Sequence, residues 1–112
     1  MPFDIVTLRP TGTTSQHLTE ALGRATAAQT DQSAEFQRLQ QQRDDLLLDG
    51  SAPAMAKADA ALVASRDLAE KIASIIMQLK ARLAAAEEAE TVARVKALFA
   101  QFHHKDETLS AW

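Results

Sequence analysis

Two adjacent histidines near the C-terminal end of the sequence are the first residues whose types could do chemistry. The run HHKDE holds His103, His104, Asp106 and Glu107, and imidazoles and carboxylates both bind divalent metals. Neighbouring residues on a helix point about 100° apart, so the two imidazoles cannot share one ion as an i, i+4 pair would. We therefore expect a solvated helix end with no metal and no other cofactor, in which histidine and lysine lie near the negative end of the helix dipole.

Clustered carboxylates, at residues 44–45 and 87–90, are the second candidates. Catalytic carboxylates need a concave and partly desolvated site, whereas these fall on helix faces whose charges are spaced for solvated ion pairs. Three oppositely charged pairs have the i, i+4 spacing: Glu20 with Arg24, Asp67 with Lys71, and Glu90 with Arg94. The sequence contains neither a glycine-rich phosphate loop nor a nucleophile with a plausible base. We expect a protein that is not an enzyme.

The composition predicts a single, elongated or oligomeric domain. The chain has 112 residues, of which 46% are hydrophobic but only 4% aromatic, so large side chains for a compact core are scarce. There is no cysteine, no secretory signal pattern at the N-terminal end and no apolar run long enough to span a membrane. We expect a soluble protein of the cytoplasm, with no membrane partner.

Nucleic acid is a weak candidate partner. The net charge is −3 and the basic residues are scattered, with no basic run. Lys71, Lys80 and Arg82 are the candidates for a small basic patch, which would make only non-specific and salt-sensitive contacts unless assembly multiplied it.

Glycine and proline positions divide the chain into an N-terminal arm (1–12), a helical hairpin (13–104) and a C-terminal tail (105–112). The hairpin is predicted to contain helices over about 14–48 and 52–104, with Thr13 and Gln16 as a capping box for the first. In the turn at 49–51, Gly50 is expected to take a left-handed C-cap conformation, Ser51 to cap the second helix, and Pro53 to lie in its first turn. Because the turn is short, the helices must run antiparallel.

The first helix carries an unbroken 4-3 spacing typical of a coiled-coil seam: Leu18, Leu22, Ala25, Gln29, Gln32, Phe36, Leu39, Arg43 and Leu46. Its polar positions either lie at a wet edge or fix the helix register or the number of subunits. The second helix carries a matching stripe: Met55, Ala58, Leu62, Ala69, Ile72, Ile76, Leu79, Leu83 and Ala86. Two helices alone cannot cover Leu39, Ile72, Ile75, Ile76 and Leu79 together, so we expect an oligomer. The residues expected to form its core are Leu18, Leu22, Phe36, Leu39, Leu46, Leu62, Ile72, Ile76, Leu79 and Leu83.

The stripe of the second helix shifts after residue 90, to Val92, Val95, Phe99 and Phe102. The second helix is predicted to extend roughly 25 to 30 Å beyond the first, so we expect these residues and Trp112 to dock on another subunit or on another protein. The arm, with FDIVTL, favours extended structure. It could lie along the projecting helix and cover the stripe, pair with a second copy, or add to a partner's sheet.

Over roughly residues 35–90, which include the run from Gln42 to Glu90, the chain resembles small helical-hairpin proteins encoded in proteobacterial prophages and phage-like gene clusters. The likeness rests on Leu46 to Gly50, on the Ala/Asp-rich start of the second helix and on LKARLAAAE. The architecture is similar to the oligomerisation hairpin of small terminase subunits, which form rings, hold DNA and engage the large terminase. This chain departs from them because it has no N-terminal helix-turn-helix for DNA recognition.

The resemblance implies a self-assembling protein of phage type that acts in DNA packaging or virion assembly, by oligomerisation and protein docking. Two other functions stay open. An inhibitor of a host protein would form a stable low oligomer with one tight partner, and a helical chaperone or adaptor would bind a client segment without forming rings. The fold class expected in each case is all-α, an antiparallel hairpin with an extended arm and a projecting C-terminal helix.

Overall fold

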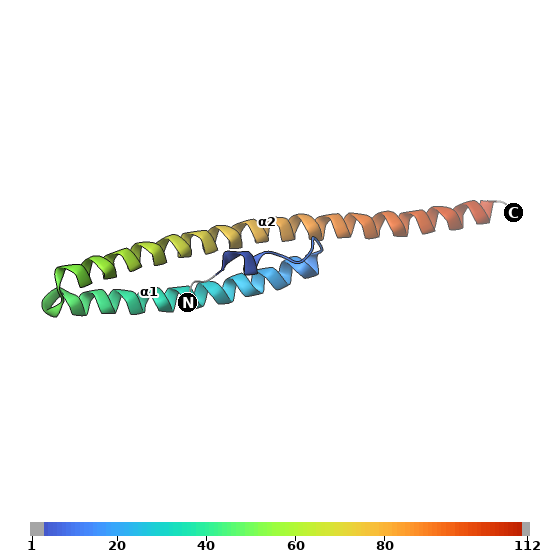
Figure 1. The fold of residues 1–112 in the computed structure, drawn as a ribbon. Coiled ribbons are helices and arrows are strands. Elements are labelled where there is room, and N and C mark those ends of the chain that lie inside the picture. Colours follow the sequence, from blue (N-terminus) through green and yellow to red (C-terminus); the bar gives the residue numbers. More distant parts are fainter. Residues whose placement is uncertain (1–3, 111–112) are drawn as a thin grey trace.

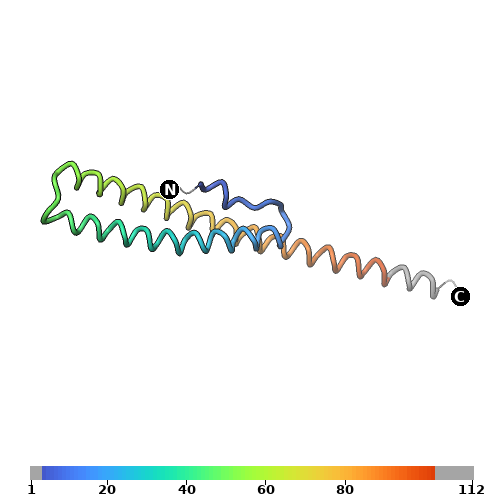
Figure 2. The backbone as a smooth tube through the Cα atoms, turned by 60° about the horizontal axis from the view of Figure 1, so that its bottom comes forward, coloured from blue at the N-terminus to red at the C-terminus, as the bar shows by residue number. Residues whose placement is uncertain are grey.

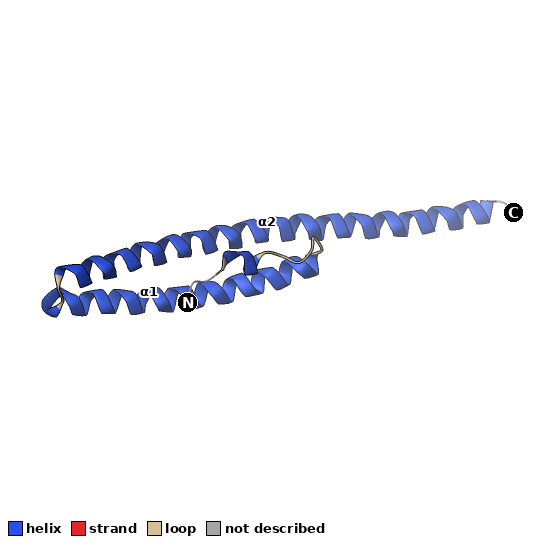
Figure 3. Cartoon of the chain, in the orientation of Figure 1, coloured by secondary structure: helices blue, strands red, loops and turns tan. Residues whose placement is uncertain are grey.

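The computed structural model describes residues 4–110, and the side chains of residues 4–102. Two long α-helices, α1 (Ser15–Asp49) and α2 (Ala52–Ser110), pack side by side in an antiparallel hairpin, preceded by a short 3-10 helix η1 (Ile5–Leu8) (Figure 1). No strand occurs in this part of the chain (Figure 3). The molecule is a rod with principal extents of 93 × 18 × 14 Å. The all-α hairpin expected from the sequence is present, and α2 runs past residue 104, where we had predicted its end.

The start of α1 is capped by Thr14, one residue later than predicted from Thr13 and Gln16. The Thr14 hydroxyl oxygen accepts a hydrogen bond from the backbone N–H of His17 at 3.2 Å, and it also lies 2.8 Å from His17 Nδ1. The histidine therefore occupies the place that glutamine has in a capping box, three residues after the cap. A side chain on Gly12 would collide with the His17 ring, so glycine lets the incoming chain pass close to the cap.

The turn between the helices uses the predicted residues in a different backbone conformation. Gly50 has φ −88° and ψ 153°, which is extended, so our expectation of a left-handed C-cap was wrong. Its N–H donates to the Leu46 carbonyl at 2.8 Å, and an added Cβ would lie 2.6 Å from that same oxygen. Glycine is therefore favoured by lack of space at the end of α1. Ser51 Oγ then accepts from the N–H of Ala54 at 3.3 Å, and Pro53 lies in the first turn of α2.

The hydrophobic core lies in the half of the hairpin away from the turn. Small residues of α1 pack there against large residues of α2 and against Leu8 of the arm, which allows a close approach of the helices. The buried apolar residues of this core are Leu8, Leu18, Ala21, Ala25, Ala28, Ile72, Ile76 and Leu79, and Leu62 is buried nearer the turn. Other predicted core residues are half-buried: Leu22, Phe36, Leu39, Leu46 and Leu83.

The seam of α1 differs from the predicted one in its first half. Ala21 and Ala28 are buried while Gln29 is exposed, so the seam runs through the alanines and not through Gln29. Gln32 is buried, and its Nε2 donates to the Ser65 carbonyl at 3.1 Å and to Ser65 Oγ at 2.5 Å. Of the two interpretations left open for the polar seam residues, this contact favours fixed register at Gln32. Gln29 has the exposed position that a wet edge predicts.

The N-terminal arm, as far as the structure describes it, is not an extended strand. Asp4 Oδ1 accepts from the N–H of Val6 at 3.0 Å and starts the single 3-10 turn of η1. The turn buries Leu8, which is 2% exposed, against the hairpin core. A single strand would have no neighbouring strand to pair with, whereas this turn is stabilised by the burial of Leu8. The arm folds back along the hairpin toward the turn (Figure 2) and is fixed by a 3.1 Å hydrogen bond from Arg24 Nη2 to the Arg9 carbonyl.

Candidate protein-docking surface

Beyond the start of α1, α2 continues as a single projecting helix (Figure 1). Near this point the N–H of Ser15, the first residue of α1, donates to Glu90 Oε1 at 3.3 Å. Hydrogen bonds from Ser15 hold the pKa of the Glu90 carboxyl below its ordinary value, and the charge of Arg94 acts in the same direction. The remaining twenty residues of α2 extend about 30 Å at 1.5 Å per residue.

The projecting helix carries five large apolar side chains that are mostly exposed, and we call them the docking surface. They are Val92, Val95, Leu98, Phe99 and Phe102, with exposed fractions of 45, 59, 66, 70 and 68%. Four of them were predicted from the sequence, which missed Leu98. Its position three residues after Val95 and four before Phe102 was the available signal. Trp112, which we had placed with them, lies outside the described residues.

The docking surface points away from α1. The residues of α2 that face α1 lie on one side of the helix, as Ile72, Ile76 and Leu79 show by their burial. At 100° per residue, Val95 and Phe99 point about 150° away from that side, on average. The side that does continue the α1-facing direction carries Arg94, Ala97 and Gln101, and none of these is a large apolar side chain. The large side chains would thus be reached by a partner from the far side of α2.

The arm does not cover the docking surface either, because it folds back toward the turn and packs beside α1 and the middle of α2 (Figures 1 and 2). The sequence had left open whether FDIVTL would lie on the projecting helix. Within one chain the part of the arm from residue 4 packs on the hairpin core through Leu8, and residues 92–102 stay exposed.

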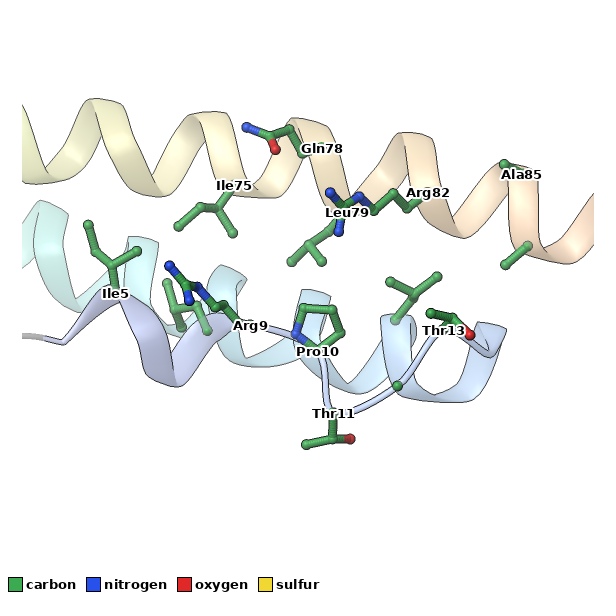
Figure 4. Close-up of a pocket in the computed structure, with 14 residues that line it drawn as sticks. Ile5, Arg9, Pro10, Thr11, Thr13, Ile75, Gln78, Leu79, Arg82 and Ala85 are labelled. Carbon is green, nitrogen blue, oxygen red and sulfur yellow. The ribbon is translucent and has the colours of Figure 1, made fainter.

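A second feature is a groove of about 910 Å³ between the arm and α2 (Figure 4). Its walls are mainly apolar, with Leu8, Ile75 and Leu79 among them, and the exposed Arg9 and Arg82 contribute two guanidinium groups. Such a lining suits an apolar group that carries a negative charge. The sequence did not reveal this groove, because it exists only where the arm folds back on the helices.

The proposed basic patch does not exist as one surface. Lys71, Lys80 and Arg82 are all exposed on α2. Lys71 and Arg82 are eleven residues apart and point in nearly the same direction, but Lys80 points about 160 to 180° away from them at 100° per residue. Arg82 lines the groove instead.

The residues that could have formed a chemical site give none among the described side chains. Asp44 pairs with Arg43 at 3.1 Å, and Asp45 accepts from Gln41 at 3.0 Å, both near the surface of α1. Among the described side chains, no group of three histidine, cysteine, aspartate or glutamate residues is placed to bind a metal ion. The side chains of His103, His104, Asp106 and Glu107 lie outside this part. Over the described residues, no helix combines the length and the apolar character that a membrane crossing requires.

Comparisons with known proteins do not place the chain in a family, since no protein-family model, curated protein or solved structure matches it. The docking surface and the groove are therefore the two features of the described molecule from which a function has to be inferred. Of these, the docking surface has the larger apolar side chains and the greater exposure.

Proposed function

We propose that the protein is a non-enzymatic assembly protein, in which the hairpin is a stiff support and the docking surface binds other protein chains, copies of this chain among them. One observation carries the proposal: Phe99 and Phe102 are 70 and 68% exposed on a helix whose base is held by a packed core. Large exposed apolar patches usually mark interaction sites, and aromatic side chains contribute most to the binding energy of interfaces.

The resemblance to phage-encoded hairpin proteins supports a more specific role. On that basis the assembly acts in DNA packaging or virion formation, in the cytoplasm of a bacterial host, and resembles a small terminase subunit in its oligomerisation hairpin. In that role the protein acts on DNA through its assembly and its docking to other proteins. Lys71, Lys80 and Arg82 do not form one basic surface for direct contact with DNA, because Lys80 points away from the other two.

The test is the mass of the assembled protein. Native mass spectrometry and sedimentation velocity at micromolar concentration should give an oligomer for the wild type. The Phe99→Ala/Phe102→Ala variant should dissociate toward monomer with unchanged helical circular dichroism. Leu47→Ala/Leu48→Ala is the matched control, because these leucines are also exposed, at 56 and 93%, but lie at the end of α1 next to the turn. The control should keep the wild-type mass.

The masses also separate the alternatives. A ring of many subunits agrees with packaging, while a stable low oligomer with one tight host partner would point to an inhibitor. A wild type that stays monomeric and binds no partner through residues 92–102 would refute the proposed function. It would also be refuted if the double phenylalanine variant lost thermal stability without any change in its association.

A further inference from the structure

We infer that the docking surface binds the same surface of a second copy, with the two α2 helices antiparallel over residues 77–102. This inference rests on the proposed function and names the partner of the same site. The described surface favours it on three grounds: the apolar face continues inward along α2, it is open to a long helix, and it is complementary to itself in both size and charge.

The face of the docking surface extends toward the middle of α2. Met77 is 73% exposed and points in nearly the same direction as Phe99, as does Glu88 between them. These three residues recur at intervals of eleven, and Ala84 and Val95 repeat the same interval. Eleven residues make close to three helical turns, so the face runs almost straight along the helix and suits a second straight helix.

The face is accessible along its whole length. On the hairpin, α1 packs against the opposite side of α2, which buries Ile72 and Leu79. The arm forms the groove together with the side of α2 that carries Ile75 and Arg82. At 100° per residue, this side of α2 also points well away from Met77. Another helix could therefore lie against Met77 and Phe99 together without meeting α1 or the arm.

The two halves of the face complement each other in size when the helices are antiparallel. The outer half carries the docking surface, while the inner half carries exposed alanines at 81 and 84. If Met77 of one copy lies opposite Phe102 of the other, Ala84 falls opposite Val95. Val95 of each copy then meets an alanine of the other, which allows close helix packing there, and Met77 meets Phe102 as a pair of large apolar side chains.

The charges on one flank of the face complement each other in the same alignment. Glu87 and Arg94 both point to this flank, about 20° apart at 100° per residue. The alignment brings Glu87 of each copy beside Arg94 of the other, and the two-fold symmetry makes this contact twice. A parallel two-fold alignment would instead place this flank of the two copies on opposite sides of the interface, where these charges do not meet. The antiparallel alignment has one unfavourable feature, because the two Glu88 side chains approach each other near the two-fold axis.

Disulfide formation tests the alignment directly, because the chain contains no cysteine of its own. In Ala84→Cys/Val95→Cys the two thiols of one chain are about 16 Å apart along the helix, too far for an internal disulfide. We expect mild oxidation to give a covalent dimer. Ala89→Cys/Ala100→Cys is the control, with the same spacing on a side of α2 about 140° away from Ala84 and Val95, and it should remain largely uncrosslinked.

Charge reversal is a second test that leaves the apolar contacts intact. Arg94→Glu should weaken dimerisation by about tenfold, because two ion pairs become two repulsive contacts. Adding Glu87→Arg should restore most of the affinity, and Glu88→Gln should strengthen it.

Two results would overturn the antiparallel alignment and leave the proposed function standing. One is an oligomer in which the Ala84→Cys/Val95→Cys variant forms no covalent dimer on oxidation, or in which the control crosslinks equally well. The other is an oligomer in which the second charge reversal restores no affinity. A chain that is monomeric and has no partner for residues 92–102 would overturn both the alignment and the proposed function.

Discussion

The buried contact between Gln32 and Ser65 allows a quantitative prediction about the register of the hairpin. It lies at the middle of α1, where the two residues are 9 and 6% exposed. Gln32 Nε2 donates both to the Ser65 carbonyl and to its hydroxyl. Ser65→Ala removes one acceptor and leaves the other, so it should cost about 1 kcal/mol, the net value of one hydrogen bond.

Gln32→Met should have a smaller effect although it removes both hydrogen bonds. Methionine keeps most of the volume, and the loss of about 2 kcal/mol of hydrogen bonding is offset because an amide no longer has to be desolvated. We expect a change within about 1 kcal/mol of the wild type. In the Gln32→Met background, Ser65→Ala should cost almost nothing, which gives a coupling energy of about 1 kcal/mol.

The four proteins should be unfolded with urea at one fixed concentration and followed by circular dichroism, because association contributes to the measured stability. An equal cost of Ser65→Ala in both backgrounds would refute the reasoning, since the serine would then act independently of the glutamine. A large loss in Gln32→Met would mean that the amide has acceptors besides Ser65. A small loss in stability accompanied by a mixture of registers would support the role of this contact in fixing one alignment.

Three further predictions follow from single contacts. Gly50→Val should lower the free energy of unfolding by about 1 to 3 kcal/mol, because the new Cβ would meet a backbone carbonyl. Gly23→Ala should raise it by roughly 0.5 to 1 kcal/mol, because the space around Gly23 is open. Equal melting temperatures for the two variants would contradict this prediction. Leu8→Ala should cost about 2 to 4 kcal/mol in thermal or urea unfolding, and a negligible loss would mean that the arm is not part of the core. The lowered pKa of Glu90 adds stability that is present above the ordinary glutamate pKa and disappears as the pH falls through the lowered value, so the stability difference between wild type and Glu90→Gln should vanish in acid.

The two helices could be predicted from the sequence because their limits depend on local chemistry. Gly50, Ser51 and Pro53 lie close together in the sequence, and each affects only the helix end next to it. Ser51 and Pro53 have the positions that serine and proline commonly take at helix starts. The conformation of Gly50 could not be predicted in the same way. Both a left-handed and an extended glycine can end a helix, and the choice depends on the path of α2 across the end of α1.

The conformation of the arm and the buried residues in the first half of α1 could not be predicted from residue spacing alone. The β-branched residues Ile5 and Val6 indicated a strand, but Asp4 caps a short turn and Leu8 gains burial between two helices. Leucine at 22 and glutamine at 29 fit the periodicity as well as Ala21 and Ala28 do. The alanines are buried because the close approach of α2 there leaves room for small side chains only.

The uneven distribution of the core explains how a single projecting helix can serve as a binding element. Near the turn, Leu39 and Leu46 are only half-buried, beside a groove of about 540 Å³, so local opening is expected to be easiest there. At the other end, Leu8 joins α1 and α2 in a buried core, and the hydrogen bond to Glu90 fixes the base of the projecting helix. The docking surface begins two residues later, on a helix that is already ordered. Binding of a partner therefore does not carry the entropic cost of ordering that helix. More of the apolar contact energy of residues 92–102 then remains as net binding free energy.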